Sequence, residues 1–250
     1  MKILVVILTI LFSSISTLHA EGLFQKHSPH NSIRLLIFTK TQQDLYIHKV
    51  TATAVEAIKN LADRFGVQTT VSNDSSIFST INLDQFQTVI FINNNGDILG
   101  DIQKNAIQNF IKSGKGIVVL HGGILANKNW PWFEQLIGAK FADHPQIQHA
   151  KLTLATDDHP VNKGLPQQWQ HRDEWYNFVL MPVNIEPLIL IDESSYQGGT
   201  HGVYHPIAWI REHGAGRVFY SAMGHTEESW ANEIFLQHIA NGISYATKWD

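Results

Sequence analysis

Histidines gather at places where the chain changes direction. Four short segments combine a histidine with glycine, proline or the end of an apolar run: 119–123 around His121, 141–145 around His144, 203–206 around His205 and 222–228 around His225. The chain holds 14 His and no Cys. A site built at these positions would therefore use imidazole, carboxylate and hydroxyl chemistry, without a thiol nucleophile.

His121 follows an apolar run and precedes Gly122 and Gly123, which permit a tight strand-to-helix turn. The arrangement resembles a nucleophile elbow with histidine in the place of serine or cysteine. We expect a base, a hydrogen-bond donor or a metal ligand at this position. The alternative is a capping histidine that bonds the local backbone.

Two carboxylates, Asp173 and Glu174, stand beside Trp175 and Tyr176. A carboxyl packed against apolar rings has a raised pKa and can act as a general acid. Sugar sites pair carboxylates, which bind hydroxyls, with flat rings, which cover the apolar faces of pyranoses. The pattern fits equally a loop whose rings fill the core and whose charges face solvent.

Trp130 precedes Pro131, a residue suited to the first turn of a helix. Trp130 is thus a candidate stacking platform for a sugar, although exposed aromatic residues here could equally mark a homodimer surface. His225 precedes Thr226, which can cap the following helix. That capping explains Thr226 but leaves His225 available for chemistry.

Cofactor motifs are weak in this sequence. No histidine pair has the His-x-x-x-His spacing of a helical metal site, so a His-held divalent metal would have to assemble from distant loops. The metal therefore stays an open alternative. No Gly-x-Gly-x-x-Gly follows the first predicted strand, which speaks against a nicotinamide site.

Bulk properties narrow the class of protein. The 250 residues suggest one domain, and a net charge of −4 with only 18 Lys and Arg gives no basic stripe for nucleic acid. Residues 1–20 have the pattern of a signal peptide, with an apolar run over 3–12 and a cleavage site near Ala20. We therefore expect an exported protein, periplasmic or extracellular, that does not span a membrane.

The periodicity predicts an α/β fold. Strands are expected at 33–38, 67–71, 88–93 and 116–120, with helices at 49–65 and 102–111 between them. This order is typical of a three-layer flavodoxin-like sandwich, whose ligands bind beyond the carboxyl ends of the parallel strands. The second half predicts strands at 151–155, 188–191, 206–211 and 217–222 and a helix over 232–247. Residues 156–205 are expected to form a loop- and β-rich insertion over the sheet edge.

Several ordered motifs resemble the trehalose-utilisation family, the ThuA-like domains, over residues 33–247. They are Trp130-Pro131-Trp132-Phe133, His144-Pro145, Asp158-His159-Pro160, Lys163-Gly164-Leu165-Pro166, Asp173-Glu174-Trp175-Tyr176, His205-Pro206-Ile207-Ala208-Trp209 and Gly224-His225-Thr226-Glu227-Glu228-Ser229. The segment 38–41, with Tyr46 and His48 after it, also looks like the first strand and loop of that family, which makes His48 a candidate.

The resemblance implies a class I glutamine-amidotransferase-like fold and a role in bacterial sugar catabolism, linked to trehalose and 3-keto-glycosides. The amidotransferase nucleophile is a cysteine at the elbow. His121 stands there in this chain, so glutamine hydrolysis by that route should be absent.

We expect an exported sugar-active protein that acts on a glycoside or an oxidised (3-keto) sugar. Its catalytic candidates are His121, Asp173, Glu174 and His225, and its substrate-binding candidates are His48, Trp130, His144, Tyr176 and His205. A base beside the carbonyl of a 3-keto sugar could promote elimination of the glycosidic bond. The alternatives are a non-catalytic carbohydrate-binding protein and a His-coordinated metal hydrolase.

Overall fold

The computed structural model describes residues 33–156, 159–179 and 182–248, so the predicted signal peptide at 1–20 lies outside the described residues. The N-terminal half alternates strands and helices as its periodicity predicts. Its elements are β1 (Arg34–Phe38), α1 (Thr51–Arg64), β2 (Gln68–Ser72), α2 (Thr80–Leu83), β3 (Thr88–Ile92), α3 (Asp101–Lys112) and β5 (Gly116–Leu120). Every residue of β3 and β5 is buried, as expected for strands covered on both faces.

The C-terminal half extends the same sheet. Its elements are α4 (Pro131–Ile137), β7 (Phe141–Asp143), β8 (Gln148–Leu154), β9 (Gln168–Asp173), β10 (Asn177–Phe178), β11 (Glu186–Asp192), β12 (Pro206–His213), β13 (Gly216–Ser221), α5 (Glu227–Trp230) and α6 (Glu233–Thr247). Two short strands, β4 (Asn95–Gly96) and β6 (Leu125–Ala126), pair with each other in loops.

One nine-stranded sheet has the order β2-β1-β3-β5-β13-β12-β11-β8-β9. The first five strands are parallel, and the remaining four pair antiparallel. The predicted insertion is therefore in part the antiparallel end of the main sheet. Strand β9 was not predicted, because QWQHRD is polar at most positions and carries no apolar alternation.

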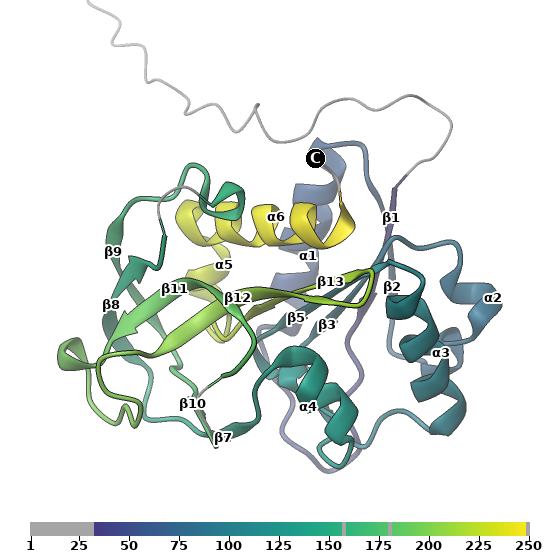
Figure 1. Ribbon diagram of the computed structural model, residues 1–250, viewed down its shortest axis with the longest axis horizontal. Coiled ribbons are helices and arrows are strands. Elements are labelled where there is room, and N and C mark those ends of the chain that lie inside the picture. The colour runs from purple at the N-terminus through teal and green to yellow at the C-terminus, as the bar shows by residue number, and fades with distance from the viewer. Residues whose placement is uncertain (1–32, 157–158, 180–181, 249–250) are drawn as a thin grey trace, which may run out of the picture.

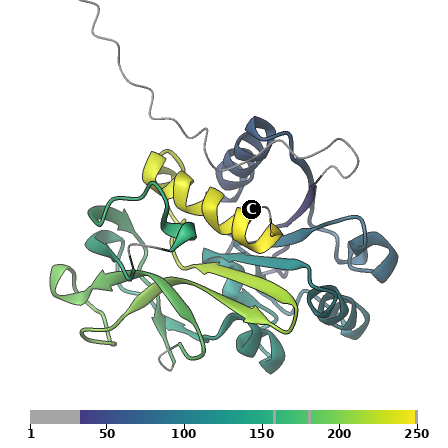
Figure 2. The same cartoon turned by 45° about the horizontal axis from the view of Figure 1, so that its top comes forward.

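Helices cover both faces of the sheet (Figure 1). Gly116 of β5 faces α6, where an added Cβ would meet the carbonyl of Ala246 at 2.0 Å. Gly216 of β13 points to the opposite face and meets Ile111 of α3 in the same way. The turned view in Figure 2 shows α6 lying across one face of the sheet, with α3 on the other side. The architecture is thus the predicted three-layer α/β sandwich.

The carboxyl ends of β1, β3, β5 and β13 meet at one edge. The residues that follow these strands include the 39–50 loop, Asn93, His121 and the 222–226 loop. Connections at this edge of a parallel sheet are where ligands bind. Among the described residues, no helix is long and apolar enough to cross a membrane.

Candidate functional site

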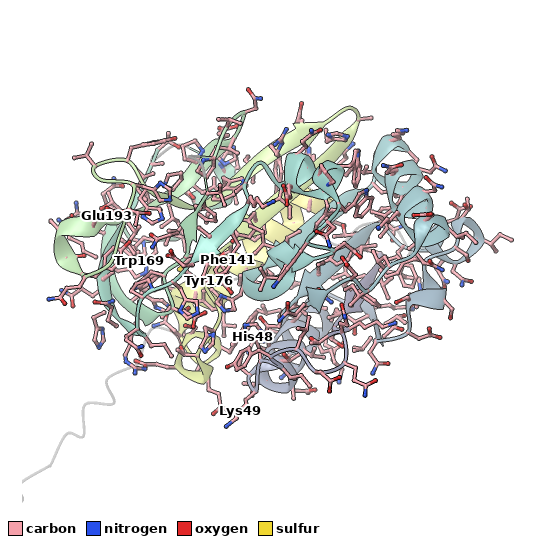
Figure 3. All side chains as sticks on the ribbon, turned by 90° about the horizontal axis from the view of Figure 1, so that it is seen from below. His48, Lys49, Phe141, Trp169, Tyr176 and Glu193 are labelled. Carbon is pink, nitrogen blue, oxygen red and sulfur yellow. The ribbon has the colours of Figure 1, made fainter. Side chains whose placement is uncertain are left out.

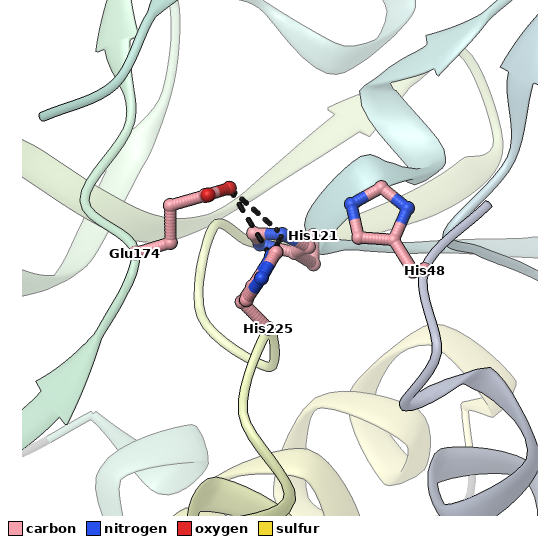
Figure 4. A group of neighbouring side chains, drawn as sticks. All are labelled: His48, His121, Glu174 and His225. Atoms are coloured by element: carbon pink, nitrogen blue, oxygen red, sulfur yellow. Dashed lines mark hydrogen bonds and ion pairs between the residues drawn. The ribbon is translucent and has the colours of Figure 1, made fainter. Parts of the chain in front are cut away.

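Three histidines and a glutamate meet beyond this edge of the sheet (Figure 4). His48, His121, Glu174 and His225 each offer one ligand atom, and these atoms all lie within 4.8 Å of one another. We call these four residues the histidine–glutamate cluster. Its members come from the connections after β1, β5, β9 and β13, so the cluster exists only once the whole sheet has formed.

His121 occupies the turn directly after β5 with a left-handed φ of +45°. A non-glycine residue in this region is strained, which is also the backbone property of a nucleophile elbow. Its Nδ1 lies 2.7 Å from the carbonyl oxygen of Ala222. Because that oxygen can only accept, Nδ1 carries a proton, and Nε2 is the nitrogen that faces the cluster.

Glu174 lies among three imidazoles. Its Oε2 is 3.2 Å from His225 Nδ1 and 3.4 Å from His121 Nε2, and its Oε1 is 3.1 Å from His144 Nδ1. Burial would raise the pKa of Glu174, but hydrogen bonds from His121 and His225 outweigh it and hold the pKa well below its usual range. We expected a raised pKa for Glu174, as a general acid requires. This environment lowers the pKa instead, so Glu174 is an anion.

His225 is the cationic partner in this arrangement. Burial alone would lower its pKa, but the hydrogen bond and charge of Glu174 raise it above the usual value. The two imidazole nitrogens, His121 Nε2 and His225 Nδ1, are 3.0 Å apart. At this separation they can share at most one proton between them.

His48 packs edge-on against both other histidines of the cluster, with ring centroids 5.0 Å from His121 and 5.4 Å from His225. The pKa of His48 is lowered to about 3, mainly by burial and then by the charges of His121 and His225. The ring is therefore neutral. Its Nδ1 is buried with no hydrogen-bond partner among the described residues. The approach depends on Gly122, where an added Cβ would lie 2.7 Å from His48 Cε1.

Tyr176 and His144 border the cluster. The Tyr176 hydroxyl lies 2.9 Å from His121 Nε2. Burial, followed by the charge of Glu174, raises the pKa of Tyr176 well above its usual value. The phenol therefore remains a proton donor. Phe141 packs on Tyr176 with ring centroids 4.6 Å apart, and both are labelled in Figure 3. The His144 side chain is 44% exposed, so solvent reaches its ring.

Asp173 does not face the cluster. It is fully buried, and its oxygens accept from the backbone N–H of Gly224 at 2.7 Å and His225 at 3.0 Å and from Ser229 Oγ at 2.8 Å. Burial would raise its pKa, but hydrogen bonding to His171 and nearby positive charge hold the pKa below its usual value. Asp173 thus anchors the loop that carries His225, and a buried anion held this way is poorly suited to donate protons.

The remaining predicted site residues lie outside the cluster. His205 is buried, and its Nε2 donates to the carbonyl oxygen of Tyr176 at 3.0 Å while its Nδ1 is 2.7 Å from Glu193. His205 therefore helps to hold the backbone of Tyr176 in place. Trp130 is 8% exposed and stacks on Phe133 with centroids 5.6 Å apart, so the structure does not bring it to the cluster.

Sequence reasoning did not find the supporting roles of Glu193 and His171. Glu193 lies in a polar turn with no motif, and it binds His205 only through the tertiary fold. His171 Nε2 bonds Ser229 Oγ at 2.9 Å, across a long stretch of chain. No local pattern signals either contact.

The cluster fits a divalent metal ion. Ligand atoms around a tetrahedral ion with bonds of about 2.1 Å lie roughly 3.4 Å apart. The atom pairs of His121, Glu174 and His225 are separated by 3.0, 3.2 and 3.4 Å. Imidazole and carboxylate donors of this kind suit zinc, iron or manganese. The carbonyl of Ala222 fixes the His121 tautomer, as the outer partners of metal-bound histidines commonly do.

The fold and site define a class I glutamine-amidotransferase-like α/β protein with histidine at the elbow. The chain belongs to the ThuA family, described as trehalose utilisation, whose model matches residues 34–246. This confirms the resemblance seen in its motifs.

Solved structures agree with the fold. A ThuA-like protein from Bacteroides uniformis ATCC 8492 is 21% identical, with a TM-score of 0.73, over 89% of this chain and 94% of that one. A ThuA-like protein from Parabacteroides merdae ATCC 43184 is 19% identical, with a TM-score of 0.68, over 87% and 91%. PurLQS from Thermotoga maritima is 13% identical, with a TM-score of 0.53, over 86% and 99%. A search of curated proteins found no match.

Proposed function

We propose that this ThuA-family protein is an exported enzyme that acts on a glycoside or an oxidised (3-keto) sugar, using a divalent metal held by the histidine–glutamate cluster. The convergence of three imidazoles and one carboxylate within 4.8 Å carries the proposal. The family description supports a sugar substrate. The apolar run and cleavage pattern of residues 1–20 support export.

A bound divalent ion would supply Lewis acidity, polarising a carbonyl or lowering the pKa of a water. The chain's own residues would position the histidines and bond the substrate. Ala222 keeps the proton of His121 on Nδ1, and the buried Asp173 holds the backbone of His225 in place. The Tyr176 hydroxyl stays protonated beside His121 and is placed to donate a hydrogen bond to a substrate oxygen.

His144 is the group best placed to move a proton. It is half-exposed, and its Nδ1 lies 3.1 Å from the anionic Glu174. In a 3-keto sugar, the C–H proton next to the carbonyl would pass to such a base. The glycosidic C–O bond would then break, and the leaving oxygen would take up a proton.

A second candidate is acid–base catalysis without metal. The ion pair of Glu174 and His225, with a separation of 3.2 Å, favours it. In that case His225 would donate a proton to the substrate. The two candidates share a substrate class and differ in what occupies the cluster.

Elemental analysis of untagged protein, followed by assays with chromogenic 3-keto-glycosides, tests the proposal. We expect about one bound zinc, iron or manganese per chain and turnover that a chelator abolishes and that metal restores. Turnover that survives in metal-free protein would establish the acid–base candidate. Sugar binding without turnover in either form would identify a carbohydrate-binding protein.

A further inference from the structure

Three consecutive asparagines, Asn93, Asn94 and Asn95, follow β3 at the edge of the sheet where the histidine–glutamate cluster lies. All three are buried, with exposed fractions of 1%, 0% and 6%. Each side-chain oxygen is buried with no hydrogen-bond partner among the described residues. A buried acceptor without a partner costs free energy of folding. Stability alone therefore does not account for this asparagine triplet.

The amide nitrogens of the triplet bond the segment that leads from β1 to α1. Asn94 Nδ2 donates to the carbonyl oxygens of Phe38 at 3.2 Å and Lys40 at 3.1 Å. Asn95 Nδ2 donates to the carbonyl oxygen of Tyr46 at 3.3 Å. Because carbonyl oxygens only accept, these contacts fix which end of each amide faces the segment. The triplet thus holds the backbone at the start of the segment and again just before His48.

Asn93 reaches His48 through one intervening hydroxyl. Asn93 Nδ2 donates to Thr51 Oγ1 at 3.2 Å, and that hydroxyl donates to the backbone carbonyl of His48 at 2.8 Å. Gly122 lies between the two side chains, since a Cβ added there would be 3.1 Å from Asn93 Cα and 2.7 Å from His48 Cε1. The backbone of His48 is therefore bonded to the end of β3, and its ring is confined against Gly122.

Apolar packing does not hold the residues that precede His48. Leu45, Tyr46 and Ile47 are 36%, 59% and 68% exposed. The backbone N–H of Gln42 donates to the carbonyl oxygen of Asn95 at 2.8 Å, which adds another bond between the segment and the triplet. Hydrogen bonds from the triplet, rather than buried side chains, therefore fix this part of the chain.

We propose that Asn93, Asn94 and Asn95 are positioning residues, which hold His48 in the cluster before any ligand binds. A site residue on a loop is held precisely only when neighbouring groups fix the loop. The unpaired side-chain oxygens are then the cost of directing every amide nitrogen of the triplet at this segment. The inference rests on the proposed function only in taking the cluster as the site, and it requires neither the metal nor the sugar.

Labelling with diethyl pyrocarbonate, which modifies accessible neutral imidazoles, tests the positioning role. The full-length protein is treated with a chelator beforehand, so that no ion protects His48, and the labelled residues are identified by mass spectrometry. His48 is 5% exposed and should react slowly in wild type. It should react about tenfold faster in Asn95→Ala and in Asn93→Gly, because each change removes one of the bonds that keep the segment closed.

The two variants are chosen so that the fold persists. Glycine suits the left-handed φ of +54° at Asn93, and Asn95→Ala introduces no charge. The matched control Asn105→Ala changes an exposed asparagine of α3 and should leave the labelling of His48 as in wild type. His144, with a side chain that is 44% exposed, should react equally in all four proteins and serves as the internal reference.

Three outcomes would overturn the positioning role. They are rapid labelling of His48 in wild type, unchanged protection of His48 in both variants, and faster labelling of the buried His171 and His238 together with His48, which would indicate general unfolding. The metal content of samples without chelator reports separately on the proposed function. Protein that holds no metal but shows the expected labelling would keep the positioning role and reject the metal centre.

Discussion

The backbone N–H of His225 donates to the Oδ1 of Asp173 at 3.0 Å. The same oxygen accepts from the N–H of Glu174 at 2.9 Å. One buried carboxylate thus fixes the backbone of two cluster members that lie far apart in sequence. Asp173 therefore has a structural role, because it holds the backbone of Glu174 and His225 in place.

Replacing Asp173 with Asn should destabilise the fold and disorder the His225 loop. The amide would present N–H groups to backbone donors, and breaking such a buried charged network costs about 3–5 kcal/mol. Urea denaturation should show this loss, whereas Asp97→Asn, at an exposed position, should leave stability nearly unchanged. A stable Asp173→Asn protein with unaltered metal affinity would contradict the anchoring role.

Replacing His225 with Ala should remove the metal while the fold persists. His225 is only partly buried, so its loss leaves no large cavity. Mass spectrometry of the purified variant should find far less metal than in wild type. The control His149→Ala removes an exposed histidine and should retain the wild-type content. Equal metal in both variants would remove His225 from the ligand set.

Replacing Tyr176 with Phe should separate binding from turnover. The variant keeps the ring that packs on Phe141 and loses only the hydroxyl beside His121. Metal content should stay constant, and kcat should fall about a hundredfold if the hydroxyl donates in the transition state. An unchanged kcat would leave Tyr176 a purely structural residue.

Replacing Gly122 with Ala should displace His48. The new Cβ would lie 2.7 Å from His48 Cε1 and 3.1 Å from Asn93 Cα. We expect metal affinity, measured by competition with a fluorescent chelator, to fall at least tenfold while the circular dichroism spectrum is preserved. Gly100→Ala is the control, because its Cβ meets only the end of the flexible Gln103 side chain. Comparable affinities for the two variants would show that the ring has room to move.

His238 should make stability sensitive to acid. It is a fully buried residue of α6, and burial, followed by the charge of His171, lowers its pKa to about 3. Below pH 6.5, His238 binds a proton in the unfolded chain but stays neutral in the folded protein. Stability is therefore lost as the pH falls from 6.5 towards 3, by at most about 1.4 kcal/mol per pH unit.

Urea denaturation between pH 7 and 4.5 measures this effect. His238→Gln removes one titrating group and should make the decline in the free energy of unfolding less steep, whereas His149→Gln should follow wild type. Parallel curves for all three proteins would show that His238 does not contribute.

The sequence predicted the parallel half of the fold well, because buried strands such as β3 and β5 are continuous apolar runs between clear turns. Helix α4 begins at Pro131, as its position before an apolar stretch predicts. Strand β9 was missed because its pairing with β8, rather than any periodicity, makes it a strand.

The cluster could be predicted only in part. His121 and His225 follow strands whose ends meet, so topology alone brings them near each other. Glu174 follows β9, at the far, antiparallel end of the sheet. No sequence pattern predicts that this strand brings Glu174 to the cluster. Its low pKa also depends on tertiary neighbours, since apolar flanking rings on their own predict the opposite shift.

The cluster draws its four members from both ends of the sheet in a chain that contains no cysteine. An ion bound to all four would act as a non-covalent cross-link between loops that are distant along the chain, a role that disulfides play in many exported proteins. Ligation would then protect the native state by mass action. Metal supply would in that way govern how long the protein survives proteolysis, as well as whether it works.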